Sequence, residues 1–187
     1  MNEQLEKLIR NAGTIIDDAR STFGKLSSAQ LNWKPSAERW SVGQCFDHLI
    51  NTNEGYLPII ESVRTGTKKT TFWERLPVLP GLVGSLLIKS LDPASTRKVK
   101  APKRFEPAQS NISASVIDDF AAQQNKIIEG MKATGHLDLE KIVITSPAVS
   151  AGFVTYSLLD AYRIIVVHEQ RHFQQAKRVT DEGGFPK

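Results

Sequence analysis

Hydrophobic residues recur every three or four positions in four long stretches of the chain, which is the spacing of one face of an α-helix. These stretches cover about residues 3–23, 41–64, 113–133 and 155–180. Pro58 falls inside the second stretch, and because proline has no amide hydrogen we expect a kink or break there. Helices of about 20 residues, each about 30 Å long, predict an all-α fold: an antiparallel four-helix bundle.

The second stretch has a clear helix start. Ser41 can cap the helix, and Gln44, three residues later, can reach back to the Ser41 amide. Trp40 precedes the cap and can pack on Cys45 as a hydrophobic staple. Asp47, one turn into the helix, is expected to be exposed. The helix should therefore begin directly after Ser41.

The segment between the second and third helices is irregular. Prolines and glycines interrupt it from about residue 65 to residue 110, and only residues 82–90 are expected to form a short helix. We interpret it as a long insertion in a single domain that spans residues 1–187. A connection of this length is usually functional or disordered, so a lid over a site is one hypothesis. After the third helix, residues 138–145 alternate weakly and predict an extended segment or a helical turn.

The net charge of +4 is unevenly distributed along the chain. Between Thr65 and Glu106, nine basic residues stand against three acidic ones. Such a segment can attract nucleic acid or an anionic small molecule. No nucleic-acid-binding motif accompanies the charge, so we interpret the segment as a solvated loop and expect no nucleic-acid partner.

Composition fits a globular protein with one core, since the chain has 187 residues and 40% of them are hydrophobic. Its apolar runs are far shorter than the ~20 residues needed to span a bilayer. Residues 1–7 are acidic and helical in character, unlike a secretory signal. We therefore expect a cytoplasmic protein without a membrane partner. Cys45, the one cysteine, cannot form an intramolecular disulfide and is expected to be a buried filler.

Two histidines mark the candidate site. His168 and His172 lie four residues apart in the fourth helical stretch, so both rings project from one helix face at a spacing that a single metal ion can bridge. That face also carries the apolar positions, and a buried ring nitrogen without a partner costs about 1–3 kcal/mol. His48, behind the capped helix start, is the candidate to complete the site. It lies on the flank of its helix's inner stripe and would have to reach a metal from the side.

Three interpretations compete for these residues. The histidines can be core-edge residues that are satisfied by ordinary side-chain partners. Alternatively, residues 168–172 match the zinc-protease pattern H-E-x-x-H, in which Glu169 is the general base. Such proteases usually take a third ligand from downstream, yet no histidine follows His172. In the third interpretation His48 is the remaining ligand.

The third interpretation is supported by a family resemblance. Residues 40–49, a tryptophan–serine helix start followed by His48-Leu49, resemble the helix-two signature of the DinB superfamily. Residues 168–175 resemble its last-helix signature: a histidine, three residues, a second histidine and then glutamine. Chain length, the number of long helices and the long link between helices two and three agree. The resemblance spans nearly the whole chain.

The resemblance implies a four-helix bundle that holds a divalent metal, zinc or nickel above all, through His48, His168 and His172. Three nitrogen ligands leave a position for water or substrate, as in a catalytic site. It implies a small-molecule substrate and either hydrolysis or a transferase reaction with a low-molecular-weight thiol as cosubstrate. The alternative is a non-enzymatic bundle that binds a metal or a small ligand. Bundles of this kind often pair, so a homodimer is also expected.

Two further residues are candidates for catalytic support. Glu169 neighbours both ligands and can orient an imidazole or move a proton; the alternative is a surface charge paired with Arg163 or Lys177. Gln175 lies near the site sector and can bond a ligand ring or a bound water. His136, in a glycine-containing turn, is expected at the surface.

Overall fold

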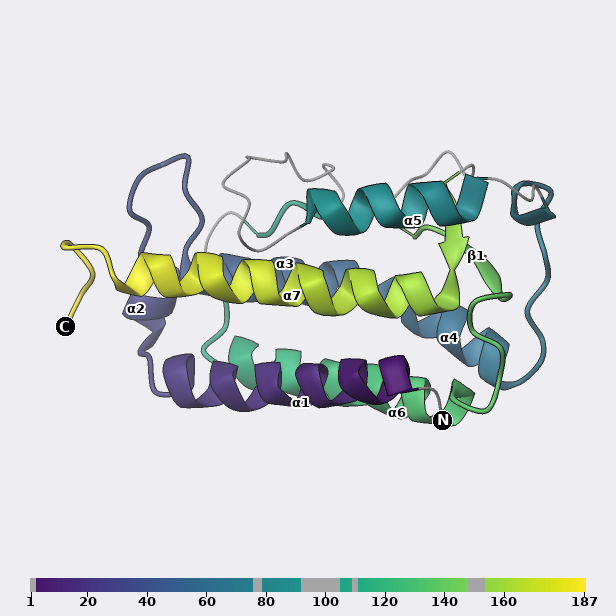
Figure 1. Cartoon of the computed structure of the whole chain (residues 1–187). Helices are drawn as coiled ribbons and strands as arrows, with labels where there is room; N and C mark the ends of the chain where they lie inside the picture. Colours follow the sequence, from purple (N-terminus) through teal and green to yellow (C-terminus); the bar gives the residue numbers. More distant parts are fainter. Residues whose placement is uncertain (1–2, 76–78, 92–104, 109–110, 148–153) are drawn as a thin grey trace.

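The computed structural model describes residues 3–75, 79–91, 105–108, 111–147 and 154–187, and α-helix dominates them (Figure 1). A 3-10 turn and one pair of short strands are the other regular elements described. The predicted all-α class is therefore confirmed. In chain order the elements are α1 (Glu3–Phe23), α2 (Ser28–Asn32), α3 (Val42–Glu54), α4 (Leu57–Arg64), η1 (Trp73–Arg75), α5 (Leu79–Ser90), α6 (Val116–Thr134), β1 (Val143–Thr145), β2 (Thr155–Ser157) and α7 (Leu158–Thr180).

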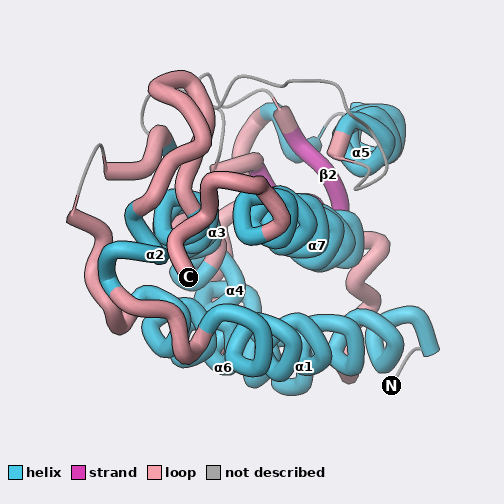
Figure 2. Tube along the Cα trace, turned by 90° about the vertical axis from the view of Figure 1, so that its left-hand side faces the viewer, coloured by secondary structure: helices cyan, strands magenta, loops and turns pink. Residues whose placement is uncertain are grey.

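The long helices form two layers. Figure 2 shows α1 beside α6 in one layer and α3 beside α7 in the other, with α5 outside α7 on the side away from α1. Contacts join α1 to α6 and α7, and join α3 to α6 and α7. The inner face of α7 is thus turned toward α3, which brings together the two helices that carry the candidate histidines.

The expected break at Pro58 is present. Helix α3 ends at Glu54, and α4 begins at Leu57 after a turn at Gly55 and Tyr56. Pro58 is the second residue of α4, where a missing amide hydrogen breaks no helical hydrogen bond. A side chain at Gly55 would not fit, because its Cβ would lie 2.8 Å from Cβ of Pro147.

The start of the last helix differs from the prediction. Residues 155–157 form β2 instead of helix, since they pair with β1 in antiparallel register, Ile144 opposite Tyr156. Ser157 then caps α7 by accepting a hydrogen bond from the amide of Asp160. Of residues 138–145, expected to be an extended segment or a helical turn, 139–141 form a turn and 143–145 form β1. The short helix α2 was not predicted, although Ser27 and Gln30 form a complete capping box before it.

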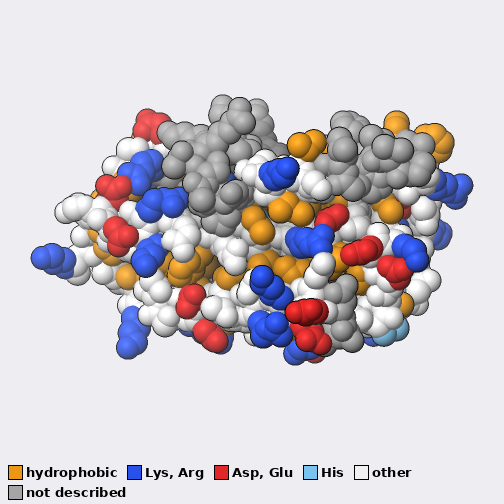
Figure 3. Space-filling model, viewed as in Figure 1, with side chains coloured by type: hydrophobic (Ala, Val, Ile, Leu, Met, Phe, Trp, Pro, Cys, Tyr) orange, Lys and Arg blue, Asp and Glu red, His pale blue; other side chains and the backbone are white. Residues whose placement is uncertain are grey.

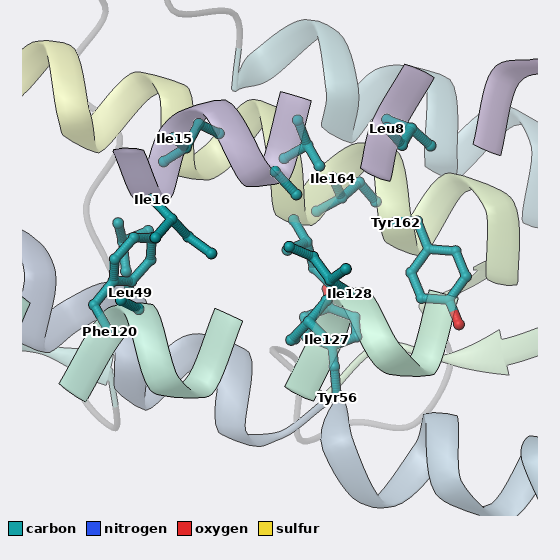
Figure 4. Packing of buried hydrophobic residues seen from close by; sticks show 14 of the residues in the cluster. Leu8, Ile15, Ile16, Leu49, Tyr56, Phe120, Ile127, Ile128, Tyr162 and Ile164 are labelled. Atoms are coloured by element: carbon teal, nitrogen blue, oxygen red, sulfur yellow. The ribbon is translucent and has the colours of Figure 1, made fainter. Parts of the chain in front are cut away.

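Apolar side chains of the long helices meet in the core (Figure 4). Phe46 of α3 is fully buried and packs edge-on against Phe23 of α1 and Phe120 of α6, with ring centroids 5.5 and 5.2 Å apart. Leu49 of α3 and Ile127 of α6 are also fully buried. Phe46, Leu49, Phe120 and Ile127 lie at the helical spacing of hydrophobic residues in their stretches, so the periodicity identified this part of the core correctly.

Three sequence predictions concern the surface and the insertion: no nucleic-acid partner, no membrane partner and a lid over the site. Basic and acidic side chains are interspersed on the face over α1 and α7 (Figure 3), so the described part of that face carries no single-sign patch. Among the described residues, no helix is both long and apolar enough to cross a membrane.

The insertion contains η1 and α5. The lid hypothesis concerns residues 65–110, of which residues 76–78, 92–104 and 109–110 lie outside the described ranges.

Candidate metal centre

Three histidines from two helices converge between α3 and α7. His48 lies in the second turn of α3, and His168 and His172 lie one turn apart in α7. One ring nitrogen of each lies within 4.8 Å of those of the other two. Nε2 of His48 is 3.2 Å from Nε2 of His168. The three residues predicted from the sequence are therefore brought together, in an arrangement compatible with one divalent metal.

All three rings are withdrawn from solvent. The exposed fractions are 4% for His48, 9% for His168 and 8% for His172. His48 was expected on the flank of its helix, and it does reach the other two rings, because α3 packs directly against α7. Its ring centroid is 5.1 Å from that of His168 and 4.7 Å from that of His172.

The backbone fixes which nitrogen of His48 faces the cluster. Nδ1 of His48 lies 2.6 Å from the carbonyl oxygen of Phe105. A carbonyl only accepts hydrogen bonds, so Nδ1 carries the proton and donates it. The lone pair of Nε2 then faces Nε2 of His168. Metal-binding histidines are commonly oriented in this way, by a carbonyl on the far nitrogen.

Burial keeps the three imidazoles neutral. Desolvation lowers the pKa of His48, although the Phe105 carbonyl and Asp47 oppose the shift. Burial, together with smaller contributions from the neighbouring His48 and Arg171, lowers the pKa of His168 to about 3. The pKa of His172 also falls well below its usual value, mainly through burial. Neutral imidazole is the form that binds metal, so at pH 7 no proton has to leave first.

One buried nitrogen is left unsatisfied. Nδ1 of His172 has no hydrogen-bond partner among the described residues. Leaving such an atom buried and unpaired costs about 1–3 kcal/mol. A donor set of neutral nitrogens that includes one orphaned atom fits a cation better than it fits an ordinary side-chain network.

An aromatic ring closes one side of the cluster. The indole of Trp40 stacks on His172 at a centroid distance of 5.5 Å and an interplanar angle of 19°. It also lies 4.9 Å from the ring of His48. Trp40 precedes the predicted cap, and both halves of the Ser41–Gln44 capping box are present. The cap thus places Trp40 against the histidines.

Glu169 is buried in the core, so the alternative of a surface charge is wrong. Asn53 of α3 donates a hydrogen bond to one carboxyl oxygen, at 2.7 Å, and Gln124 of α6 donates to the other, at 2.6 Å. Full burial raises the pKa of Glu169 to about 8, against these two hydrogen bonds. The carboxyl thus joins α7 to α3 and α6. Sequence reasoning missed this cluster, although Asn53 and Gln124 stood as polar residues on apolar stripes.

Four other residues considered in the sequence differ in how far they are buried. Gln175 is half-buried and lies close enough to His172 for its side chain to oppose part of the fall in the pKa of that ring. Asp47 is half-buried instead of exposed, and its carboxylate accepts the amide hydrogen of Ala108. Cys45 is fully buried, as expected, and burial raises the pKa of its thiol to about 12. His136 is exposed, as expected.

Comparison with known proteins gives two matches. The model of the DinB superfamily matches residues 14–176, a range that contains all three histidines. The chain is also similar to "Uncharacterized protein YuaE" of Bacillus subtilis (strain 168). The two are 28% identical over 160 residues, which cover 84% of this chain and 87% of the relative. No solved structure gives a significant match.

Proposed function

This chain belongs to the DinB superfamily, and from that premise we propose that it is a metal-dependent enzyme in which His48, His168 and His172 hold one divalent ion. The observation that carries the proposal is the convergence of three buried, neutral imidazoles, one of which has an unsatisfied nitrogen. Superfamily membership agrees with this arrangement but names no reaction.

The donor set indicates the kind of ion. Three imidazole nitrogens without a carboxylate favour zinc or nickel over magnesium or calcium, which prefer oxygen ligands. A site with three protein ligands leaves at least one position for a substrate. When bound, such an ion acts as a Lewis acid that lowers the pKa of water or of a thiol.

Residues around the histidines would hold the rings in place. The Phe105 carbonyl keeps His48 in the tautomer whose Nε2 can bind the ion. Gln175 lies beside His172 and is the candidate to support that ring, through a hydrogen bond or a bound water. Trp40 stacks on the His172 ring, lies tilted against the His48 ring and would keep water from that side. A proton-transfer role for Glu169 stays a prediction, because its carboxyl oxygens are engaged by Asn53 and Gln124.

For the reaction we propose hydrolysis of a small molecule or transfer of a low-molecular-weight thiol to one. Both reactions need a nucleophile that is deprotonated near pH 7, which a bound Lewis-acidic ion would supply. The zinc-protease interpretation has less support, since its general base would be Glu169, whose carboxyl lies in the core between two amides. A non-enzymatic metal-binding bundle remains the second candidate.

Elemental analysis of protein purified without a histidine tag tests the metal site. We expect close to one zinc or nickel ion per chain in the wild type and loss of metal in His48→Ala and His172→Ala. His136→Ala, which changes an exposed histidine, is the matched control and should keep its metal. Metal retained by His48→Ala would reduce the site to the α7 pair, and a metal-free wild type would overturn the proposal.

Activity assays then separate the two reaction classes from simple binding. Thiol conjugation to a panel of electrophiles tests the transferase, and ester and amide hydrolysis test the hydrolase. Either activity should disappear together with the metal in His48→Ala. A metal-loaded protein that is inactive in all of these assays, and whose ion exchanges no ligand with added thiol, would favour the non-enzymatic bundle.

A further inference from the structure

The end of the insertion lies against the first turns of α3. We call Phe105–Ala108 the return segment. Gln44 donates a hydrogen bond from Nε2 to the carbonyl of Ala108, at 2.9 Å. The amide of Ala108 donates to Oδ2 of Asp47, also at 2.9 Å, and Nδ1 of His48 donates to the carbonyl of Phe105, at 2.6 Å. These three α3 residues share one helix face, because they stand at positions i, i+3 and i+4.

The hydrogen-bonding groups of α3 are themselves held in place. Oε1 of Gln44 accepts the amide hydrogen of Ser41, which leaves Nε2 free to reach Ala108. Oδ2 of Asp47 also accepts a hydrogen bond from Asn51, at 3.2 Å. The Asp47 carboxylate is therefore oriented from its own helix before it meets Ala108.

Within the return segment, burial alternates along the chain. The side chains of Phe105 and Pro107 are buried, whereas Glu106 and Ala108 are exposed. Pro107 also restricts the backbone between the two hydrogen-bonded residues. Fixing Ala108 thus restricts where the Phe105 carbonyl can lie, three residues earlier. Asp47 can therefore influence the hydrogen bond at Nδ1 of His48 through the backbone of the return segment.

We infer that Asp47 is a positioning residue of the metal centre, which holds the return segment so that the Phe105 carbonyl keeps the His48 ring in its ligating tautomer and orientation. The inference rests on the proposed function, since it assumes that His48 binds a metal. Partners on the far nitrogen of a ligand histidine typically change metal affinity by about 10- to 100-fold. The coupling is reciprocal, so metal binding should strengthen the docking of the return segment by the same factor.

Two substitutions at Asp47 separate a positioning hydrogen bond from a charge effect. Asp47→Ala removes the acceptor for Ala108, and we expect it to weaken zinc affinity about tenfold. Asp47→Asn keeps an acceptor oxygen but loses the charge, so its zinc affinity should stay within about threefold of wild type. Glu54→Ala, which changes an exposed acid of the same helix, is the matched control. Zinc affinity is measured by competition with a chromogenic chelator.

Hydrogen exchange of the Ala108 amide supplies an independent readout. It should be faster in Asp47→Ala than in the wild type, and in the wild type it should slow when zinc is added. Wild-type zinc affinity in Asp47→Ala, despite fast exchange, would show that Asp47 only docks the return segment. If Asp47→Asn bound zinc as weakly as Asp47→Ala, the effect would come from the charge of Asp47 and the positioning role would be wrong. If zinc did not change hydrogen exchange of the Ala108 amide in the wild type, the coupling would be overturned, even if Asp47→Ala did not fold.

The tautomer of His48 distinguishes failure of this inference from failure of the proposed function. Nitrogen NMR of the metal-free wild type should show His48 protonated at Nδ1, and Asp47→Asn should preserve that state. Asp47→Ala should shift it toward protonation at Nε2. A wild type that binds no zinc would reject the metal site, while these spectra would still decide whether Asp47 positions the ring.

Discussion

Replacing Glu169 with glutamine should change how the stability of the metal-free protein depends on pH. Burial raises the pKa of this carboxyl from 4.5 to about 8 in the folded protein. In the unfolded chain it is exposed and ionises near 4.5. Between these pH values the folded state binds one more proton than the unfolded state. The stabilisation is complete below pH 4.5 and is lost as the pH rises through about 8.

The size of the effect follows from the pKa difference. Each pH unit inside this window lowers the free energy of unfolding by about 1.4 kcal/mol. The three site histidines have pKa values below their usual 6.5, so their contribution rises with pH, outweighs the loss below about pH 6.5 and levels off above it. This histidine contribution is the same in both proteins, so it cancels when Glu169→Gln is compared with the wild type. Between about pH 6.5 and pH 8, Glu169→Gln should gain about 1.5–2 kcal/mol relative to wild type.

Urea unfolding followed by circular dichroism, with a chelator present, measures this difference. Glu54→Gln, an exposed site on α3, is the matched control and should follow the wild-type curve. Stopping at about pH 8 avoids the ionisation of Cys45, whose usual pKa is 9.0. Parallel curves for wild type and Glu169→Gln across this range would refute the argument that the folded protein holds Glu169 protonated.

Other predictions concern the packing of the bundle. Gly130→Ala should lower the free energy of unfolding by about 1–3 kcal/mol in thermal melts, because the new Cβ would lie 2.5 Å from Cγ2 of Ile60. Gly13→Ala is the matched control in α1, because nothing lies within 4 Å of the new Cβ. It should raise the free energy of unfolding by up to about 1 kcal/mol. Cys45 should react with a thiol reagent only as fast as the protein unfolds, since it is buried and its pKa is raised to about 12. Rapid labelling in native buffer would contradict this.

Local signals made much of the fold predictable. The capping box at Ser41 and Gln44 located the start of α3 to the residue, and Pro58 located the break before α4. Both signals act within one or two helical turns, so a single sequence contains them completely. The spacing of His168 and His172 is also local, because helix geometry alone puts them on one face.

Features that depend on distant residues were harder to predict. The partner of His48 on its far nitrogen is a backbone carbonyl 57 positions later, and a carbonyl leaves no mark in a sequence. Glu169 looked equally suited to the surface, since its burial depends on amides from two other helices. The helix start near residue 155 was wrong because pairing with β1 overrode the local helical pattern.

The three histidines do not share one rigid support. His168 and His172 are separated by a single turn of α7, so helix geometry sets their spacing. The gap to His48, 3.2 Å between its Nε2 and that of His168, depends instead on how closely α3 approaches α7. Substitutions among the apolar side chains between these helices can widen or narrow that gap without touching any ligand. Evolution can therefore retune the site for ions of different radius by remodelling the hydrophobic interior alone.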